Sequence, residues 1–244
     1  MAASKLLNTH HLLRIFMQEF AIQTENLTKI FNKGKNNEVE AVLDINLSVK
    51  SGTCVLLSGA SGSGKTTLLS LLSCLTRPTA GKYHCLGQEV SHWSEKFLTE
   101  FRQKHLGIVF QHFNLIKKMT SQVNIGLPLL AQNYSLAQIE KKVQQVAQDV
   151  GIEQRLNFEI DTLSGGELQR VAIARALVGE PDIIFADEPT SHLDSENSEQ
   201  ILYLFSQLKA AGKTIIITSH DSLVRSHQLI DETFELKDGL AILK

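Results

Sequence analysis

The organisation of the chain is decided by ten residues, Ser58-Gly59-Ala60-Ser61-Gly62-Ser63-Gly64-Lys65-Thr66-Thr67. From Gly59 onward they follow the pattern Gly-x-x-x-x-Gly-Lys-Thr, which is typical of a phosphate-binding loop. The apolar residues 54–57 before the loop predict a buried strand, and residues 68–75 after it predict a helix. Phosphate binding needs this strand-loop-helix context, because the first amides of a helix and the positive end of its dipole attract anions.

Each residue type in this loop has a chemical role. Glycines let the backbone wrap around a phosphate chain without Cβ clashes, so we expect the binding groups of residues 59–67 to be mainly main-chain amides. Lys65 can reach the terminal phosphates as a point charge, and the Thr66 hydroxyl can ligate the magnesium ion that neutralises them. A Gly- and Ser-rich turn between a strand and a helix can match the same pattern by chance, so the rest of the chain has to decide.

The composition is that of a globular protein. The chain has 244 residues, of which 43% are hydrophobic and 20% are charged, enough for one large α/β domain or two small ones. Its net charge of -2 gives no broad attraction for nucleic acid, so we expect no nucleic-acid partner, although a local basic patch stays open. The three cysteines lack metal-ligand spacing and indicate buried thiols in a cytosolic protein. No run approaches the roughly 18–20 apolar residues of a membrane span, so at a membrane another chain would supply it.

Residues 1–19 are predicted to be an extension outside the main domain, which covers residues 20–244. The extension contains a short apolar cluster at residues 12–16, but Arg14 interrupts it and no small-residue cleavage site follows, which argues against a signal peptide. Two interpretations stay open. Either Met17 is the true start, or residues 12–20 form a short helix that docks on a partner or on a membrane surface.

The chain before the loop reads as strands, the chain after it alternates between strand and helix, and the middle of that part reads mostly as helix. Residues 20–25 and 39–49 have strand patterns; Phe31, between them, is either a core residue or a ring that stacks on an adenine. Residues from about 112 to 178 predict an inserted helical subdomain. One helix there starts after Ser135 and ends near Gly151, and its predicted apolar face consists of Leu136, Ile139, Val143, Val146, Ala147 and Val150. Residues 127–130 read as a bend, and the apolar residues 113–130 either dock a partner or pack within the subdomain.

A second anion site is predicted at Leu163-Ser164-Gly165-Gly166-Glu167, which opens a helix. Ser164 and Glu167 have the spacing of a capping box, in which each side chain bonds an unpaired backbone amide of the first turn. The two glycines cost helix stability and are best explained if an anion must approach the backbone closely.

Polar side chains follow three other predicted strands. Asp187 and Glu188 end a strand; Asp187 would hold magnesium or its water, and Glu188 would orient and deprotonate an attacking water. Gln111 ends the strand at residues 106–110, where its amide can coordinate a metal and hold a water. His220 ends the strand at residues 213–218, where it can contact a terminal phosphate.

Taken in order, these motifs resemble those of the ATP-binding cassette ATPases. The resemblance runs from about residue 20 to the C-terminus. It rests on residues 59–66, Gln111, the signature Leu163-Ser164-Gly165-Gly166-Glu167, Asp187-Glu188, Ser191-His192-Leu193-Asp194 and His220. The signature is the specific part, because other phosphate-loop proteins share the first motif. The resemblance implies an α/β phosphate-loop fold with a central, mostly parallel sheet, an antiparallel β subdomain and an inserted helical subdomain.

The resemblance also implies a mechanism. The chain would hydrolyse ATP as a head-to-tail dimer with itself or a similar subunit, each nucleotide lying between one phosphate loop and the partner's Ser164, Gly165, Gly166 and Asp194. Glu188 would be the catalytic base, with Gln111 and His220 checking the water and the γ-phosphate. Magnesium would be held at Thr66, Gln111 and Asp187. Phe31 would take the place of the adenine-stacking aromatic, which in the family is usually Tyr.

Residues 108–115 and 165–177 look like the branch that includes lipoprotein-releasing, macrolide-exporting and cell-division ATPases. This implies an ATPase subunit on the inner face of the cytoplasmic membrane that drives an integral membrane permease, in export or lipoprotein release. The alternative is an ATP-switched cell-division or regulatory ATPase that moves no substrate. A DNA-repair or ribosome-associated cassette is less favoured, because the coiled-coil, zinc or tandem-cassette insertions of those relatives are absent. His192 departs from the branch, which often has Gly-Asn in this segment.

Overall fold

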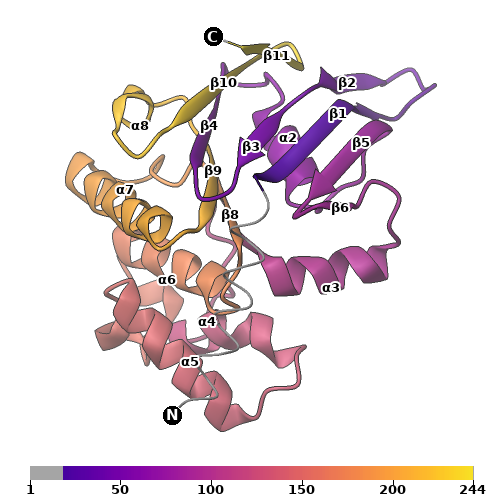
Figure 1. The fold of residues 1–244 in the computed structure, drawn as a ribbon. Coiled ribbons are helices and arrows are strands. Elements are labelled where there is room, and N and C mark those ends of the chain that lie inside the picture. Colours follow the sequence, from indigo (N-terminus) through magenta and orange to yellow (C-terminus); the bar gives the residue numbers. More distant parts are fainter. Residues whose placement is uncertain (1–18, 244) are drawn as a thin grey trace.

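The computed structural model describes residues 19–243, and the predicted extension at residues 1–19 lies outside this range except for its last residue (Figure 1). At its centre is a six-stranded sheet in the order β11-β10-β4-β9-β8-β7. Five of its strands run parallel and β11 is antiparallel to β10. The strands are β4 (Cys54–Ser58), β7 (Leu106–Val109), β8 (Ile183–Asp187), β9 (Thr214–Thr218), β10 (Glu232–Lys237) and β11 (Leu240–Leu243). The predicted mostly parallel sheet is confirmed.

A second, antiparallel sheet has the order β2-β1-β5-β6, with β3 also paired to β1. Its strands are β1 (Phe20–Phe31), β2 (Val39–Ile45), β3 (Ser48–Lys50), β5 (Ala80–Cys85) and β6 (Gln88–Glu89). Two predicted boundaries were wrong here. The strand expected at residues 20–25 continues to Phe31 through irregularities of register. The strand expected at residues 39–49 is divided into β2 and β3, which both pair with β1; between them the amide of Leu47 donates to the Thr24 hydroxyl, at 2.9 Å, and not to a backbone oxygen of β1.

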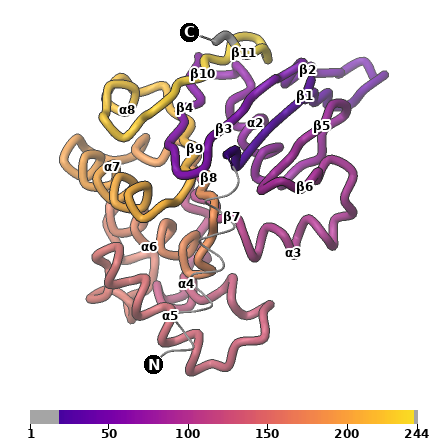
Figure 2. Tube along the Cα trace, viewed as in Figure 1, coloured from indigo at the N-terminus to yellow at the C-terminus, as the bar shows by residue number. Residues whose placement is uncertain are grey.

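The helical subdomain lies at the opposite end of the molecule from the antiparallel sheet, as the tube in Figure 2 also shows. It contains α4 (Ser121–Leu130), α5 (Leu136–Asp149), the short 3-10 helices η1 (Glu153–Arg155) and η2 (Ile160–Thr162), and α6 (Gly165–Leu177). The bend predicted at residues 127–130 was wrong. Pro128 lies inside α4, in the last turn, where helix packing by the buried Ile125 and Leu129 outweighs one missing hydrogen bond.

The amphipathic helix after Ser135 is confirmed, with one exception. Ile139, Val143 and the rest of the predicted apolar face are buried, but Leu136 is 79% exposed because it occupies the first helical position, beyond the contact with α4. Both capping-box bonds of Ser135 and Gln138 start this helix, and Gly151 follows its end with a φ of 70°.

The remaining helices cover the two faces of the parallel sheet. They are α2 (Lys65–Leu72), α3 (Glu95–His105), α7 (Ser195–Ala210) and α8 (Ser222–Ser226). Alternate residues of β4 face opposite cores: Cys54 and Leu56 pack toward the helical subdomain, whereas Val55 and Leu57 pack toward α2 and the antiparallel sheet. The parallel sheet is therefore buried on both faces, which explains the continuous apolar runs of its strands.

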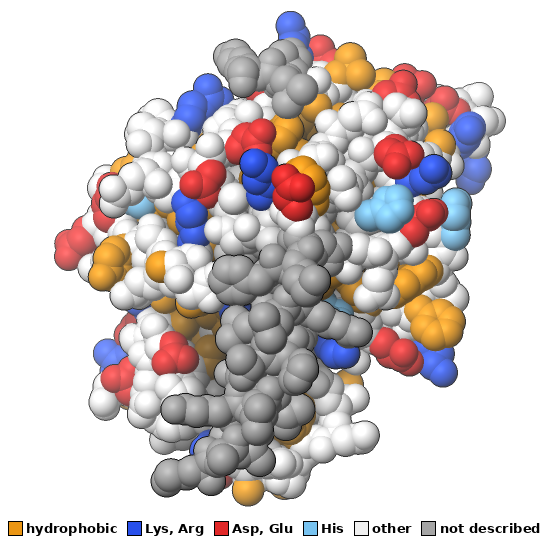
Figure 3. Space-filling model, in the orientation of Figure 1, with side chains coloured by type: hydrophobic (Ala, Val, Ile, Leu, Met, Phe, Trp, Pro, Cys, Tyr) orange, Lys and Arg blue, Asp and Glu red, His pale blue; other side chains and the backbone are white. Residues whose placement is uncertain are grey.

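All three cysteines are buried free thiols, as predicted. Burial raises the pKa of both the Cys54 and Cys74 thiols to about 12, so both stay protonated at neutral pH. Acidic and basic side chains are interspersed over the face shown in Figure 3. Among residues 19–243, no helix is both long and apolar enough to cross a bilayer.

Candidate functional site

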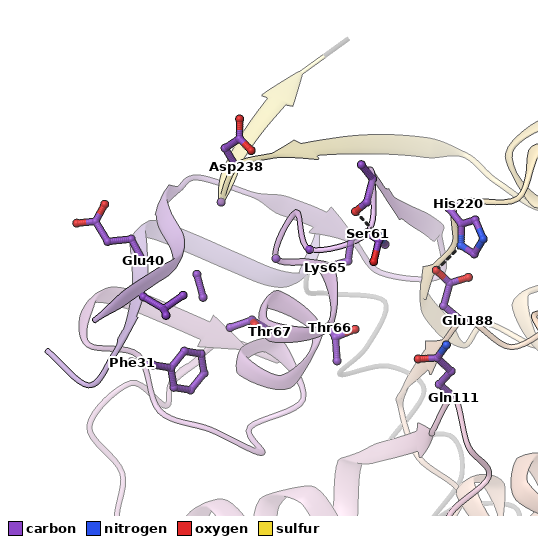
Figure 4. Close-up of a pocket in the computed structure, with 16 residues that line it drawn as sticks. Phe31, Glu40, Ser61, Lys65, Thr66, Thr67, Gln111, Glu188, His220 and Asp238 are labelled. Atoms are coloured by element: carbon purple, nitrogen blue, oxygen red, sulfur yellow. Dashed lines mark hydrogen bonds and ion pairs between the residues drawn. The ribbon is translucent and has the colours of Figure 1, made fainter. Parts of the chain in front are cut away.

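The polar residues predicted at strand ends come together at one edge of the parallel sheet. β4, β7, β8 and β9 run in the same direction, so their carboxyl ends deliver the phosphate loop, Gln111, the Asp187-Glu188 pair and His220 to a common edge. A cavity of about 810 Å³ opens there (Figure 4). Its walls are formed by Phe31, Val39, Glu40, Ala41, Ala60, Ser61, Gly62, Gly64, Lys65, Thr66, Thr67, Gln111, Glu188, His220, Asp238 and Gly239. This volume suits a ligand of nucleotide size.

The phosphate loop owes its shape to glycine. Gly59, Gly62 and Gly64 have φ angles of 147°, 78° and 100°, a region that other residues rarely adopt. A Cβ on Gly64 would also lie 2.4 Å from the backbone oxygen of Ala41. Gly64 caps α2 without any side-chain hydrogen bond, and the first turn of α2 contains no acidic residue. The amides at the start of α2 are thus left for an anion in the cavity.

Lys65 is the first residue of α2, and its side chain reaches back to the start of the loop. It is 8% exposed, and its Nζ donates hydrogen bonds of 2.9 Å to the carbonyl oxygens of Gly59 and Ala60. Both acceptors are neutral backbone groups. A bound phosphate oxygen would offer this ammonium a charged acceptor and a stronger bond.

Asp187 joins the phosphate loop to the neighbouring strands. Its Oδ1 accepts hydrogen bonds from the hydroxyls of Thr66, at 3.3 Å, and Thr218, at 2.5 Å, and the residue is 7% exposed. A carboxylate and a hydroxyl that converge beside a phosphate site are the oxygen ligands that Mg²⁺ prefers. The donor set at Thr66 and Asp187 therefore fits the predicted magnesium ion, and Gln111 lines the same cavity.

Glu188 occupies the wall next to the phosphate loop. Its φ of 47° is unusual for glutamate, and its amide is held by the Thr218 hydroxyl at 3.0 Å. Its side chain is 9% exposed, and its Oε1 lies 2.8 Å from Nδ1 of His220. In Figure 4 Gln111 lies below Glu188 with its amide turned toward the carboxylate. A buried, oriented carboxylate at the edge of a phosphate site is suited to take a proton from a water.

Phe31 lies in the wall opposite Glu188 (Figure 4). Phe31 is 40% exposed, and Nζ of Lys29 lies 5.1 Å from the centroid of its ring. Its exposure at the cavity surface rules out the interpretation of Phe31 as a core residue, whereas stacking on an adenine stays a prediction. Glu40, Ala41, Asp238 and Gly239 also form this wall and were not foreseen. The one local signal was the Asp-Gly dipeptide at residues 238–239, which predicts a hairpin turn but not its proximity to the loop.

The second predicted anion site does not reach this cavity. Ser164 caps α6 with both capping-box bonds, as expected, but neither it nor Gly165 and Gly166 lines the cavity. Asp194 is also elsewhere. It caps α7 by accepting a 2.8 Å bond from the amide of Asn197, and the Asn197 bonds hold the pKa of the Asp194 carboxyl below its ordinary value.

Comparison with known proteins shows which family has this sequence and fold. The sequence model of the ABC transporter family matches residues 42–191. The chain belongs to this family. It is 40% identical over 218 residues to the uncharacterized ABC transporter ATP-binding protein YvrO of Bacillus subtilis, covering 89% of this chain and 94% of that protein. It is 37% identical over 223 residues to the macrolide export ATP-binding/permease protein MacB of Wolinella succinogenes, where it covers 91% of this chain but spans only about a third of the relative.

Solved structures of ABC cassettes agree with the fold. The dimeric, post-hydrolysis structure of the cassette MJ0796 bound to ADP and Pi superposes with a TM-score of 0.82 at 35% identity, covering 89% of this chain and 95% of the other. CbiO1 of Clostridium perfringens, part of an ABC transporter complex, superposes with a TM-score of 0.82 at 28% identity, covering 93% and 88%. This ABC cassette is thus a nucleotide-binding ATPase with the predicted fold.

Proposed function

We propose that the chain is the ATP-hydrolysing subunit of a membrane complex of the export or lipoprotein-release type, and that it works as an ATP-sandwiched dimer. The observation that carries the dimer is the separation of the two anion sites. The phosphate loop lines the cavity, whereas the glycine pair at the start of α6 lies outside it. A second subunit placed head to tail would bring its α6 to this cavity. The dimeric cassette structure similar to this chain supports the arrangement.

In the proposed dimer the roles divide among the residues of the cavity. The phosphate loop and Lys65 hold the triphosphate, and Phe31 stacks on the base. Glu188 accepts the proton of the attacking water, while His220 and Gln111 orient the carboxylate, the water and the γ-phosphate. A magnesium ion held by Thr66, Asp187 and Gln111 would neutralise phosphate charge. Ser164, Gly165, Gly166 and Asp194 would act on the nucleotide of the partner subunit.

The proposed membrane partner is an integral permease bound from the cytoplasmic side. Support comes from a groove of about 220 Å³ between the sheet core and the helical subdomain, lined mainly by apolar residues that include Leu75, Phe110 and Pro128. Large apolar side chains are also exposed on α4, at Val123 and Leu130, and in the loop before it, at Ile116 and Met119. The apolar stretch at residues 113–130 is therefore not packed within the subdomain alone. MacB relatives carry export and permease functions in their names, over a length about three times that matched here.

The chemistry is tested by Glu188→Gln. We expect steady-state ATPase to fall at least about 100-fold, the contribution of a general base, while ATP binding persists. Size-exclusion chromatography with ATP should then show a trapped dimer. Glu140→Gln is the matched control, because Glu140 is exposed on α5 outside the cavity, and it should behave as wild type. Equal ATPase rates for Glu188→Gln and wild type would refute the role of Glu188.

The membrane role is tested with the same variant. Glu188→Gln with ATP is incubated with solubilised native membranes, and captured proteins are identified by mass spectrometry. A polytopic membrane protein, captured with ATP and absent when Lys65→Ala is the bait, supports the transport assignment. Capture of soluble proteins alone would contradict it and favour the ATP-switched regulatory dimer.

A further inference from the structure

Two histidines connect the loops that follow β7 and β8. The ring of His192 stacks on that of His112, with centroids 5.6 Å apart and planes inclined by 23°. The same His192 ring meets Phe113 edge-on, with centroids 6.3 Å apart. These distances fall within the range of attractive aromatic pairs. His112 directly follows Gln111, and His192 lies four residues after Glu188.

The loop that contains His192 is fixed relative to Glu188. The backbone oxygen of Glu188 accepts bonds from the amide of Ser191, at 3.2 Å, and from its hydroxyl, at 3.0 Å. The amide of Leu193 donates to the oxygen of Thr190 at 3.1 Å. Consecutive turns therefore lead from the proposed base to His192, so the imidazole sits at a set position with respect to the Glu188 backbone.

The segment after Gln111 is in turn held in an unusual shape. Phe113 and Asn114 have φ angles of 58° and 49°, and their carbonyl oxygens accept 2.5 Å bonds from the guanidinium of Arg175 in α6. Two neighbouring non-glycine residues in this region need such external support. Arg175 holds the far end of the segment, and the His192 ring contacts the end that adjoins Gln111.

We infer that His192 is a positioning residue for ATP hydrolysis. By stacking on His112 it ties the loop carrying Gln111 to the loop carrying Glu188, and so sets the distance between the two groups that handle the attacking water. The inference rests on the proposed roles of Gln111 and Glu188. It requires a flat ring at position 192 but no charge and no hydrogen bond, which distinguishes it from a general structural role.

The test compares side chains with and without a ring. His192→Asn keeps a polar side chain and removes the ring, and we expect kcat for ATP to fall about three- to tenfold, as for a small misplacement of reacting groups, with KM within twofold of wild type. His192→Phe keeps the ring and should stay within about twofold of wild-type kcat. His92→Ala, an exposed histidine outside the cavity, is the control and should change neither constant.

Substitution of His112 gives a second, independent test of the inference. His112→Ala should lower kcat as His192→Asn does, and the double variant should show no further fall, because both changes break one contact. Both rings belong to exposed residues, so the variants should unfold at the wild-type temperature. Additive falls, an unchanged kcat in His192→Asn, or a His192→Phe as slow as His192→Asn would each overturn the inference. If Glu188→Gln keeps wild-type ATPase activity, the proposed role of Glu188 as the base is refuted, independently of the results for the His192 and His112 variants.

Discussion

The two glycine-rich helix starts of this ATPase differ in what bonds the unpaired backbone amides of the first turn. At α2 the cap is Gly64, no side chain bonds the first amides, and no acid lies in the first turn. At α6 the cap is Ser164, and the carboxylate of Glu167 accepts bonds of 2.9 Å from both its amide and its hydroxyl. One anion site is open in the single chain, whereas the other already contains a carboxylate of its own.

This difference indicates that the site at α2 can bind phosphate within one subunit, whereas the site at α6 depends on a phosphate from a partner subunit. The open start of α2 has positive potential facing a cavity, so it is ready for phosphate within one subunit. At α6 the internal carboxylate is balanced by Arg155, whose Nε lies 2.6 Å from Glu167 Oε1. A phosphate that reaches α6 from a partner subunit must share Ser164 with Glu167. We therefore expect substitutions at α2 to affect the fold and binding together, and substitutions at α6 to affect activity with little effect on the fold.

The largest effect is expected from Gly64→Ala. The φ of 100° and the 2.4 Å approach to the Ala41 oxygen both oppose a Cβ, so the loop should be displaced at a cost of about 1–3 kcal/mol or more. We expect ATP affinity to fall more than about tenfold and the unfolding temperature to drop. Titration with a fluorescent ATP analogue measures the affinity, and thermal unfolding measures the unfolding temperature.

Gly62→Ala is the matched control for that prediction. Gly62 also has a positive φ, 78°, but a Cβ there would meet no atom within 4 Å. It should therefore cost only the backbone strain, about 1 kcal/mol, and bind ATP more tightly than Gly64→Ala. If the two variants were equally impaired, strain rather than close approach would explain the whole effect.

The next effect is expected from Gly165→Ala in α6. Gly165 lacks a positive φ, and a Cβ would lie 3.6 Å from the nearest atom, the His192 oxygen, so the helix accepts alanine without strain. Because the methyl group would block an anion from the backbone, we expect ATPase to fall about tenfold at unchanged or slightly raised stability. Gly179→Ala, where the nearest atom is 3.5 Å away, should change neither quantity. Wild-type ATPase in Gly165→Ala would show that nothing approaches this turn closely.

The features that the sequence could predict are those specified by residues close together in the chain. The strand before the phosphate loop, the capping box of α6 and the acids at the end of β8 were predicted because periodicity and short spacings specify them. The parallel direction of the strands then brings their ends together without further information.

The sequence did not reveal features created by pairing between distant segments. Glu40 reaches the cavity because β2 pairs with β1, and Asp238 reaches it because the turn between β10 and β11 packs over the loop. The stacking of His112 on His192 depends on which strands are neighbours. Pro128 was misjudged because tertiary packing overrode a local helix-breaking signal. The roles assigned to individual site residues remain predictions.

A smaller effect is expected from Arg155→Ala. Its removal leaves the Glu167 carboxylate unbalanced beside the proposed site for a partner's phosphate. One exposed charge is worth up to about 1 kcal/mol, so the ATP concentration that gives half-maximal ATPase should rise about two- to fivefold. Adding Glu167→Gln to this variant removes the repulsion and should restore most of the loss. If the double variant were no better than Arg155→Ala, the guanidinium would act by packing on Phe158, whose ring centroid lies 4.8 Å from it.

The smallest effect is a pH dependence of the α6 cap. The bond from Arg155, followed by that from the Ser164 amide, lowers the pKa of the Glu167 carboxyl below its ordinary 4.5. A carboxyl whose pKa is lowered by folding stabilises the fold above pH 4.5, and this stabilisation is lost as the pH falls through the lowered pKa. Wild type should therefore unfold about 1–3 °C above Glu167→Gln at neutral pH, and the difference should vanish in acid. The exposed Glu140→Gln should show no such trend. A constant difference at all pH values would mean that the shape of Glu167, and not its charge, caps the helix.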